Sequence, residues 1–162
     1  MVKVNLGCGN NVLKGWDNYD LYPISNDVKL LNLNVIPLPF KDDSIEEILI
    51  DNVFERLDVN TFELIKELHR ILKKNGLLTI VVPICSFKIV HTIGFFPRHY
   101  FNVLCTSAGC NNGYKDGKLF RLVSVSVDPN NFFTRLANRF HVLEHLFPFM
   151  LSGRYIYRLE KN

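Results

Sequence analysis

The stretch that decides the fold reads V-N-L-G-C-G-N-N and occupies residues 4–11. Its apolar first half predicts a strand, and its glycines predict a tight turn directly after that strand. Gly7 and Gly9 carry no Cβ, so the backbone of this turn can lie against a bound molecule. In open α/β sheets, ligands bind outside the carboxyl ends of the strands, where such a turn is placed. Taken alone, two glycines after a strand indicate only a tight turn.

A helix followed by a buried strand gives the class of the fold. Residues 61–74 repeat apolar side chains at helical spacing, and Asn60 precedes them as a candidate N-cap. We expect Gly76 to end the helix in a left-handed conformation. Residues 77–82 read L-L-T-I-V-V, which predicts a strand covered on both faces, as in a parallel sheet. Helix, glycine and buried strand make half of a βαβ unit, so we expect an α/β fold.

Shorter strands are expected elsewhere along the chain. Their ranges are residues 3–6, 18–20, 28–31, 47–50, 119–127 and 154–160. Only 11 positions lead from Gly9 to Asp20. A covering helix needs about 10 to 12 residues in addition to its turns, so this connection has no room for one. The N-terminal half is therefore predicted to have reduced helices.

Composition excludes several classes of protein. The chain has 162 residues, of which 48% are hydrophobic, and we expect a single domain over residues 1–162. A net charge of +3 does not by itself support binding to nucleic acid. Four scattered cysteines are too few for a disulfide framework, and no apolar run reaches the roughly 18 residues of a membrane span. We therefore expect a cytoplasmic protein with no transmembrane segment.

Two further features follow the glycine turn. Asp20 ends the second expected strand, where a carboxylate can accept hydrogen bonds from both hydroxyls of a ribose. A surface aspartate that begins a turn is the alternative. Residues 32–40 read N-L-N-V-I-P-L-P-F, in which Asn32 could bond an adenine amino group and the Leu33 backbone a ring nitrogen. An edge strand that ends in a proline-rich loop explains this segment equally well, but the three features in this order point to an adenosine-containing cofactor.

With these segments in hand, the sequence resembles the class I S-adenosylmethionine-dependent methyltransferases, and especially their small type-11 group. The resemblance rests on V-N-L-G-C-G, G-W-D-N-Y-D, N-L-N-V-I-P-L-P-F, S-I-E-E-I, V-F-E-R-L and R-I-L-K-K-N-G, which follow in the family's order between residues 3 and 83. It implies a Rossmann-like methyltransferase fold, with a mostly parallel sheet and an antiparallel C-terminal strand. It also implies S-adenosylmethionine as the cofactor.

The resemblance further implies a set of cofactor-binding residues. These are Leu6, Gly7, Cys8, Gly9, Asp20, Leu21, Asn32, Leu33 and Asn52. The glycine turn would hold the methionine part, Asp20 the ribose, and Asn32 with Leu33 the adenine. Three positions depart from the family pattern, because Asn32 stands for an aspartate, Arg56 for a histidine and Asn11 for a third glycine. The first departure keeps a hydrogen-bond acceptor and loses a charge.

Candidates for catalysis lie in the second half of the chain. His91 and His99 flank an aromatic run and could act as a general base, although histidines at a helix surface or a core edge are the favoured interpretation. Cys105 and Cys110 beside them have poor spacing for zinc, so no metal is expected. The aromatic run itself could cover an apolar acceptor or form an interface between copies of the chain.

The leading hypothesis is methyl transfer from S-adenosylmethionine to an unidentified acceptor, which is a small molecule or a macromolecule. The alternative is a binding module or partner subunit that holds S-adenosylmethionine without catalysis. An NAD-dependent oxidoreductase fits poorly, because G-C-G-N-N-V-L lacks the G-x-x-G continuation and the helix that receives a pyrophosphate. The second half matches no motif, so the sequence does not indicate the acceptor.

Overall fold

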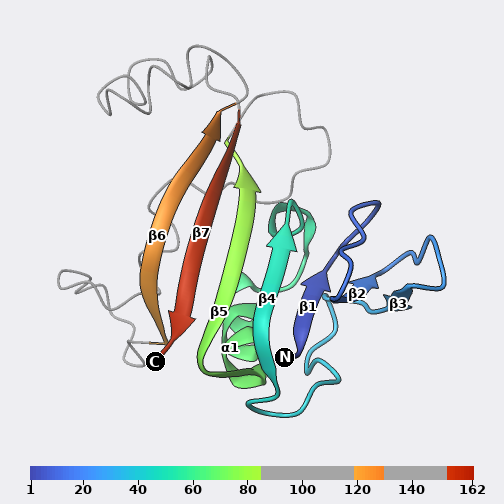
Figure 1. Cartoon of the computed structure of the whole chain (residues 1–162), viewed down its shortest axis with the longest axis horizontal. Helices are drawn as coiled ribbons and strands as arrows, with labels where there is room; N and C mark the ends of the chain where they lie inside the picture. The colour runs from blue at the N-terminus through green and yellow to red at the C-terminus, as the bar shows by residue number, and fades with distance from the viewer. Residues whose placement is uncertain (85–118, 130–152) are drawn as a thin grey trace.

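The computed structural model describes residues 1–84, 119–129 and 153–162, and these form one mixed sheet with a helix packed against it (Figure 1). The strands are β1 (Lys3–Leu6), β2 (Asp17–Asp20), β3 (Val28–Leu30), β4 (Ile45–Asp51), β5 (Leu72–Pro83), β6 (Phe120–Pro129) and β7 (Gly153–Lys161). The helices are the 3-10 helix η1 (Phe54–Arg56) and the α-helix α1 (Thr61–Ile71).

The sheet has the order β3-β2-β1-β4-β5-β7-β6. The first five strands pair in parallel, whereas β7 runs antiparallel to both β5 and β6. The C-terminal strand is thus inserted between β5 and β6 in the opposite direction (Figure 1). This confirms the expected Rossmann-like fold with a mostly parallel sheet and an antiparallel C-terminal strand.

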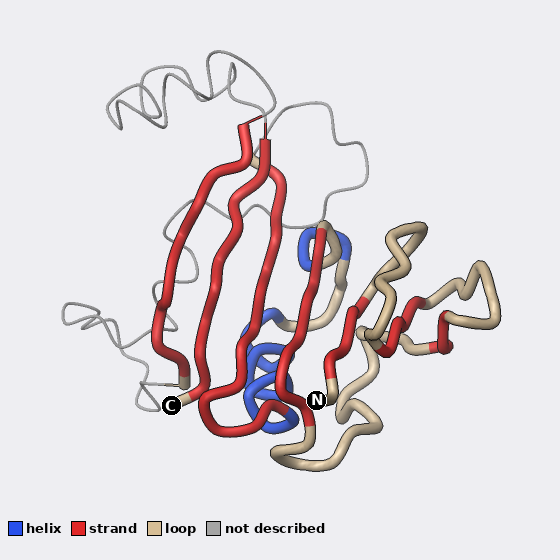
Figure 2. The backbone as a smooth tube through the Cα atoms, in the orientation of Figure 1, coloured by secondary structure: helices blue, strands red, loops and turns tan. Residues whose placement is uncertain are grey.

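The N-terminal half has few helices, as expected. Residues 7–16, which connect β1 to β2, contain turns and no helix, and Figure 2 shows loops at both connections among β1, β2 and β3. Within the described parts of the chain, no helix is long and apolar enough to cross a membrane.

The helix α1 begins where the sequence predicts. The Asn60 side chain accepts hydrogen bonds from the backbone N–H groups of Phe62, at 2.9 Å, and Glu63, at 3.3 Å. These bonds satisfy two amide groups that a helix leaves without an internal partner. The apolar face of α1 contributes Leu64, Ile65, Leu68 and Ile71 to the core, and all four are fully buried.

The end of α1 differs from the expectation of a helix over residues 61–74. The helix stops at Ile71, and the next residue already belongs to β5. Leu72 is fully buried and pairs with Ile45 of β4, while its carbonyl oxygen accepts a hydrogen bond from Lys161 Nζ at 2.7 Å. Pairing within the sheet and burial therefore take over from helical propensity at this point.

The left-handed residue after the helix is also a different one from that expected. Asn75 has a φ of 62°, and Gly76 is not among the residues with positive φ. A Cβ on Gly76 would lie 2.7 Å from Cγ of Leu72, which is too close for non-bonded carbons. Glycine is thus required at position 76 for space, and the asparagine supplies the left-handed turn.

Candidate cofactor site

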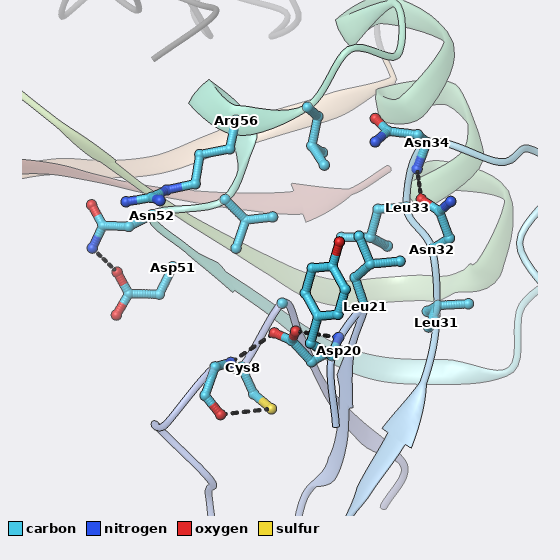
Figure 3. A pocket seen from close by; sticks show the side chains of 15 residues that line it. Cys8, Asp20, Leu21, Leu31, Asn32, Leu33, Asn34, Asp51, Asn52 and Arg56 are labelled. Carbon is cyan, nitrogen blue, oxygen red and sulfur yellow. Dashed lines mark hydrogen bonds between the residues drawn. The ribbon is translucent and has the colours of Figure 1, made fainter. Parts of the chain in front are cut away.

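A cleft of about 490 Å³ lies at the carboxyl ends of four parallel strands (Figure 3). Its walls are the segments that directly follow β1, β2, β3 and β4. The lining residues are Gly7, Cys8, Gly9, Asp20, Leu21, Tyr22, Leu31, Asn32, Leu33, Asn34, Asp51, Asn52, Val53, Arg56 and Leu57. This is the edge at which open α/β sheets bind their ligands.

The two glycines of the turn after β1 are needed for different reasons. Gly7 has a φ of +70°, and a Cβ there would lie 2.4 Å from Cγ2 of Val53. Gly7 is therefore packed against the segment that follows β4. Gly9 has a φ of +49°, and a Cβ there would meet nothing within 4 Å. The backbone at Gly9 consequently faces open space in the cleft, where a ligand can approach it.

Asp20 is held in place by backbone amide groups on both sides. Its Oδ2 accepts a hydrogen bond from Gly9 N–H at 2.8 Å, and its Oδ1 accepts one from Tyr22 N–H at 2.9 Å. A carboxylate offers about four lone-pair positions, so two bonds leave acceptor capacity on each oxygen. The remaining positions suit a pair of neighbouring hydroxyl groups, such as those of a ribose.

Two buried asparagines shape the connection between β1 and β2. Asn5 and Asn18 have 1% and 3% of their surface exposed, and Asn5 Nδ2 donates to Asn18 Oδ1 at 3.0 Å. Asn18 also bonds the backbone of Leu13 in both directions, at 2.9 and 3.0 Å, and donates to the carbonyl oxygen of Trp16. Asn5 in turn donates to the carbonyl oxygen of Asn11 at 2.9 Å. These side chains stand in for the hydrogen bonds that a helix would have supplied.

The segment after β3 presents polar groups to the cleft from its other side. Asn32 is exposed, and its Oδ1 accepts a hydrogen bond from Asn34 N–H at 3.0 Å, while Leu33 is buried at 5% exposure. The Asn34 Oδ1 accepts bonds from the amide groups of Asp58, at 2.9 Å, and Val59, at 3.2 Å. Asn34 therefore joins this segment to the loop that precedes α1.

The end of β4 and the segment after it carry most of the charge in the cleft. Asn52 has a φ of 55°, and its Nδ2 donates to Asp51 Oδ1 at 2.7 Å. The other oxygen of Asp51 lies 3.6 Å from Nη1 of Arg154 in β7. The Arg56 side chain is 58% exposed and extends toward Asn52 in Figure 3. Asp51 thus already has two partners, whereas Arg56 points into the cleft.

Burial changes the acidity of two groups beside the cleft. Desolvation raises the pKa of the Cys8 thiol, and the nearby Asp20 charge raises it further. Glu55 is 2% exposed, and its Oε2 has no hydrogen-bond partner within the described residues. Burial is also the main reason that the pKa of Glu55 is raised, with the charge of Asp51 acting in the same direction. Cys8 is therefore a poorly reactive thiol, and Glu55 holds its proton more tightly than an exposed glutamate.

Eight of the nine cofactor residues expected from the sequence line the cleft together. The ninth, Leu6, is the last residue of β1, directly before the glycine turn, and its side chain is fully buried in the core. His91, His99, Cys105 and Cys110 lie outside the described residues. Among the residues that the structure does describe, no cluster of side chains suits a metal ion.

Sequence reasoning did not assign the remaining lining residues to the cofactor. They are Tyr22, Leu31, Asn34, Asp51, Val53, Arg56 and Leu57. Most of them directly neighbour a residue that was assigned, at the end of β2, β3 or β4. Counting outward from each strand end would have found them.

About half of the chain matches a known protein family. Residues 5–80 match the family model of a methyltransferase domain. A comparison with curated protein sequences gives no significant match.

Several solved structures share the fold over 99% of this chain. One is an S-adenosylmethionine-dependent methyltransferase from Mesorhizobium loti, with 12% identity, 90% of its chain covered and a TM-score of 0.56. Another is coclaurine N-methyltransferase bound to N-methylheliamine and S-adenosylhomocysteine, with 11% identity, 67% covered and a TM-score of 0.61. A third is the [4+2]-cyclase SpnF, with 10% identity, 74% covered and a TM-score of 0.62. Residues 5–80 of this chain therefore match a methyltransferase domain, and the described chain has a fold that solved S-adenosylmethionine-dependent methyltransferases share.

Proposed function

We propose that this protein transfers the methyl group of S-adenosylmethionine to an acceptor whose identity is not yet established. The observation that carries the proposal is the position of Asp20. Its carboxylate is fixed by Gly9 N–H and Tyr22 N–H and lies between the glycine turn and the segment after β3 (Figure 3). This arrangement suits a ribose in the middle of an adenosyl ligand.

The rest of the cleft suits the two ends of the same molecule. Asn32 and Leu33 are assigned to the adenine, because one is a polar side chain in the cleft and the other an apolar, buried neighbour. The turn at Gly7, Cys8 and Gly9, together with Asn52, is assigned to the methionine part. Leu21 follows Asp20 in the lining of the cleft and is assigned to the side of the ribose.

The chemistry is a direct displacement. The acceptor atom forms a bond to the methyl carbon while the bond from that carbon to the sulfonium breaks, and S-adenosylhomocysteine is the product. Alignment of the two reactants accounts for much of the rate acceleration, so a rigid cofactor site contributes to catalysis by positioning the methyl group. A general base is needed only when the acceptor must lose a proton, and His91 and His99 are the candidates.

A second function stays open, namely a binding module or enzyme that uses the fold without transferring a methyl group. The solved structure described as a [4+2]-cyclase supports this second function, because a protein with the same fold is named there for a different reaction. Fold alone does not determine chemistry.

Ligand binding and turnover distinguish these functions. With S-adenosylmethionine or S-adenosylhomocysteine at 100 times its Kd, stabilisation of about 2.7 kcal/mol should raise the melting temperature by roughly 5 to 10 °C. NAD should give no shift. No shift with either adenosyl ligand at millimolar concentration would reject the proposal. Transfer of a labelled methyl group to any member of an acceptor panel supports the enzyme, whereas binding without transfer supports the module.

Location and assembly are part of the proposal. We assign the protein to the cytoplasm, as expected from its sequence. We also propose that residues 1–162 form a single domain, because β1 and β7 belong to one sheet. An interface between copies through the aromatic second half is retained as a proposal. Its test is the mass of the protein in solution, measured by light scattering across a range of concentrations.

A further inference from the structure

The described lining of the cleft contains a single cation, Arg56, together with the two carboxylates Asp20 and Asp51. Figure 3 shows Arg56, Asp51 and Asn52 on one side of the cleft, with Asn32 and Asn34 on the opposite side. If the adenine lies at Asn32 and the ribose at Asp20, the methionine arm extends toward Arg56. That arm ends in the one anionic group of S-adenosylmethionine, its carboxylate.

Within the described parts of the chain, the guanidinium of Arg56 has one acidic neighbour, Glu55, and holds it only in a long ion pair. Its Nε lies 3.7 Å from Glu55 Oε1, which is beyond hydrogen-bond distance. Glu55 is almost fully buried, and burial raises its pKa while the charge of Arg56 acts in the opposite direction. Asp51 lies closer to other groups, since its oxygens face Asn52 and Arg154. Apart from the ion pair with Glu55, the described residues offer the Arg56 side chain no other polar partner, so most of its five N–H donors are available to a ligand in the cleft.

We propose that Arg56 binds the carboxylate of the methionine arm and thereby selects cofactors that carry the complete amino acid. This inference rests on the proposed function and adds the residue that distinguishes S-adenosylmethionine from adenosyl compounds without a carboxylate. A guanidinium suits the task, because its planar fork matches a carboxylate with two parallel hydrogen bonds. Sequence reasoning noted Arg56 only as a replacement for the histidine of the family pattern.

The test compares two ligands that differ only in this carboxylate. S-adenosylhomocysteine and its decarboxylated analogue, S-adenosyl-3-thiopropylamine, are titrated by calorimetry into the wild-type protein and into Arg56→Gln. The wild type should bind S-adenosylhomocysteine about 10-fold more tightly than the analogue, as expected for one charge-assisted contact. Arg56→Gln should weaken S-adenosylhomocysteine by about 10-fold and leave the analogue unchanged.

Two further variants complete the design. Arg56→Lys keeps the charge without the fork, so it should retain part of the preference. Arg121→Gln removes an exposed arginine of β6 that pairs with Glu160, outside the cleft, and should bind both ligands as the wild type does. Melting temperatures measured without ligand show whether each variant is folded.

The outcomes separate this inference from the proposed function. Equal weakening of both ligands by Arg56→Gln, or a wild type that does not distinguish them, overturns the role of Arg56 while the proposed function stands. A wild type that binds neither ligand at millimolar concentration removes both.

Discussion

The backbone N–H of Gly9 donates a hydrogen bond to Oδ2 of Asp20 at 2.8 Å, which joins the turn after β1 to the end of β2. The N–H groups of Gly7 and Cys8 both donate to the carbonyl oxygen of Tyr19 at the same junction, at 2.8 and 3.0 Å. The carboxylate is therefore already oriented before a ligand enters. A ligand that binds this carboxylate therefore loses little free energy to ordering of the site, which favours affinity.

Asp20→Asn should separate binding from stability. The amide keeps one oxygen as an acceptor but loses the charge and the second acceptor, so the affinity for S-adenosylhomocysteine should fall by about 10-fold or more. The free energy of unfolding should fall by only about 1 kcal/mol, because a single backbone contact is weakened. Calorimetry and urea unfolding measure the two quantities.

Asp17→Asn is the matched control for that variant. Asp17 lies on the same strand, but its side chain pairs with Lys29 on the surface, away from the cleft. Its affinity for S-adenosylhomocysteine should equal that of the wild type. A drop of the same size in both variants would contradict the role assigned to Asp20.

Gly7→Ala should mainly lower the stability of the protein, whereas Gly9→Ala should mainly lower its affinity for the ligand. At Gly7 the new methyl group meets Val53 at 2.4 Å, so the free energy of unfolding should fall by about 2 kcal/mol or more. At Gly9 the methyl group has space and only the strain of a positive φ, about 1 kcal/mol, is added. Gly9→Ala should instead lose ligand affinity. Urea unfolding and calorimetry on both variants check this contrast.

The combination of Gly7→Ala with Val53→Ala tests the cause. The smaller side chain removes the two Cγ atoms that the new methyl group meets. The double variant should therefore be more stable than the sum of the single effects predicts. Strict additivity would show that the strain at Gly7 comes from its backbone conformation alone.

Local signals explain what the sequence predicted correctly. The order of strand, glycine turn and Asp20 was confirmed, because each element is encoded by residues that are adjacent in the chain. The start of α1 was confirmed as well, since an N-cap such as Asn60 acts within one helical turn. The missing helix between β1 and β2 follows from distance along the chain alone.

Tertiary contacts explain what the sequence did not predict. Asn5 and Asn18 were not assigned a role, because two asparagines in separate strands acquire a meaning only when β1 and β2 pair in parallel. The predicted end of α1 was wrong for the same reason. Leu72 belongs to β5, because it pairs with Ile45 and its carbonyl oxygen accepts a hydrogen bond from Lys161, and both residues are distant in the chain. Arg56 belongs to the cleft only because β4 lies beside β1.

His69 should make the protein less stable in mild acid. It packs edge-on against Phe120, with ring centroids 5.3 Å apart, and burial followed by the charge of Lys161 lowers its pKa in the folded state. Below about pH 6.5 the unfolded chain therefore takes up a proton that the folded chain resists. The free energy of unfolding should fall as pH decreases from 7 toward 5. The free energy of unfolding of His69→Gln, measured by urea titration at each pH, should fall less steeply than that of the wild type. Parallel curves for the two proteins would exclude this contribution.

Glu55 should have the opposite effect on a different pH range. Burial raises the pKa of its carboxyl group above the ordinary value, so the folded state holds a proton that the unfolded chain releases near pH 4.5. Stability from this group is therefore present below that pH and is lost as pH rises through the raised pKa. Glu55→Gln carries no titrating group and should lose less stability between pH 4.5 and pH 8 than the wild type does. Asp58→Asn, at an exposed position nearby, should follow the wild-type curve in the same urea titrations. If Glu55→Gln also follows the wild-type curve, the carboxyl group of Glu55 titrates alike in the folded and unfolded chains, which contradicts a pKa raised by burial.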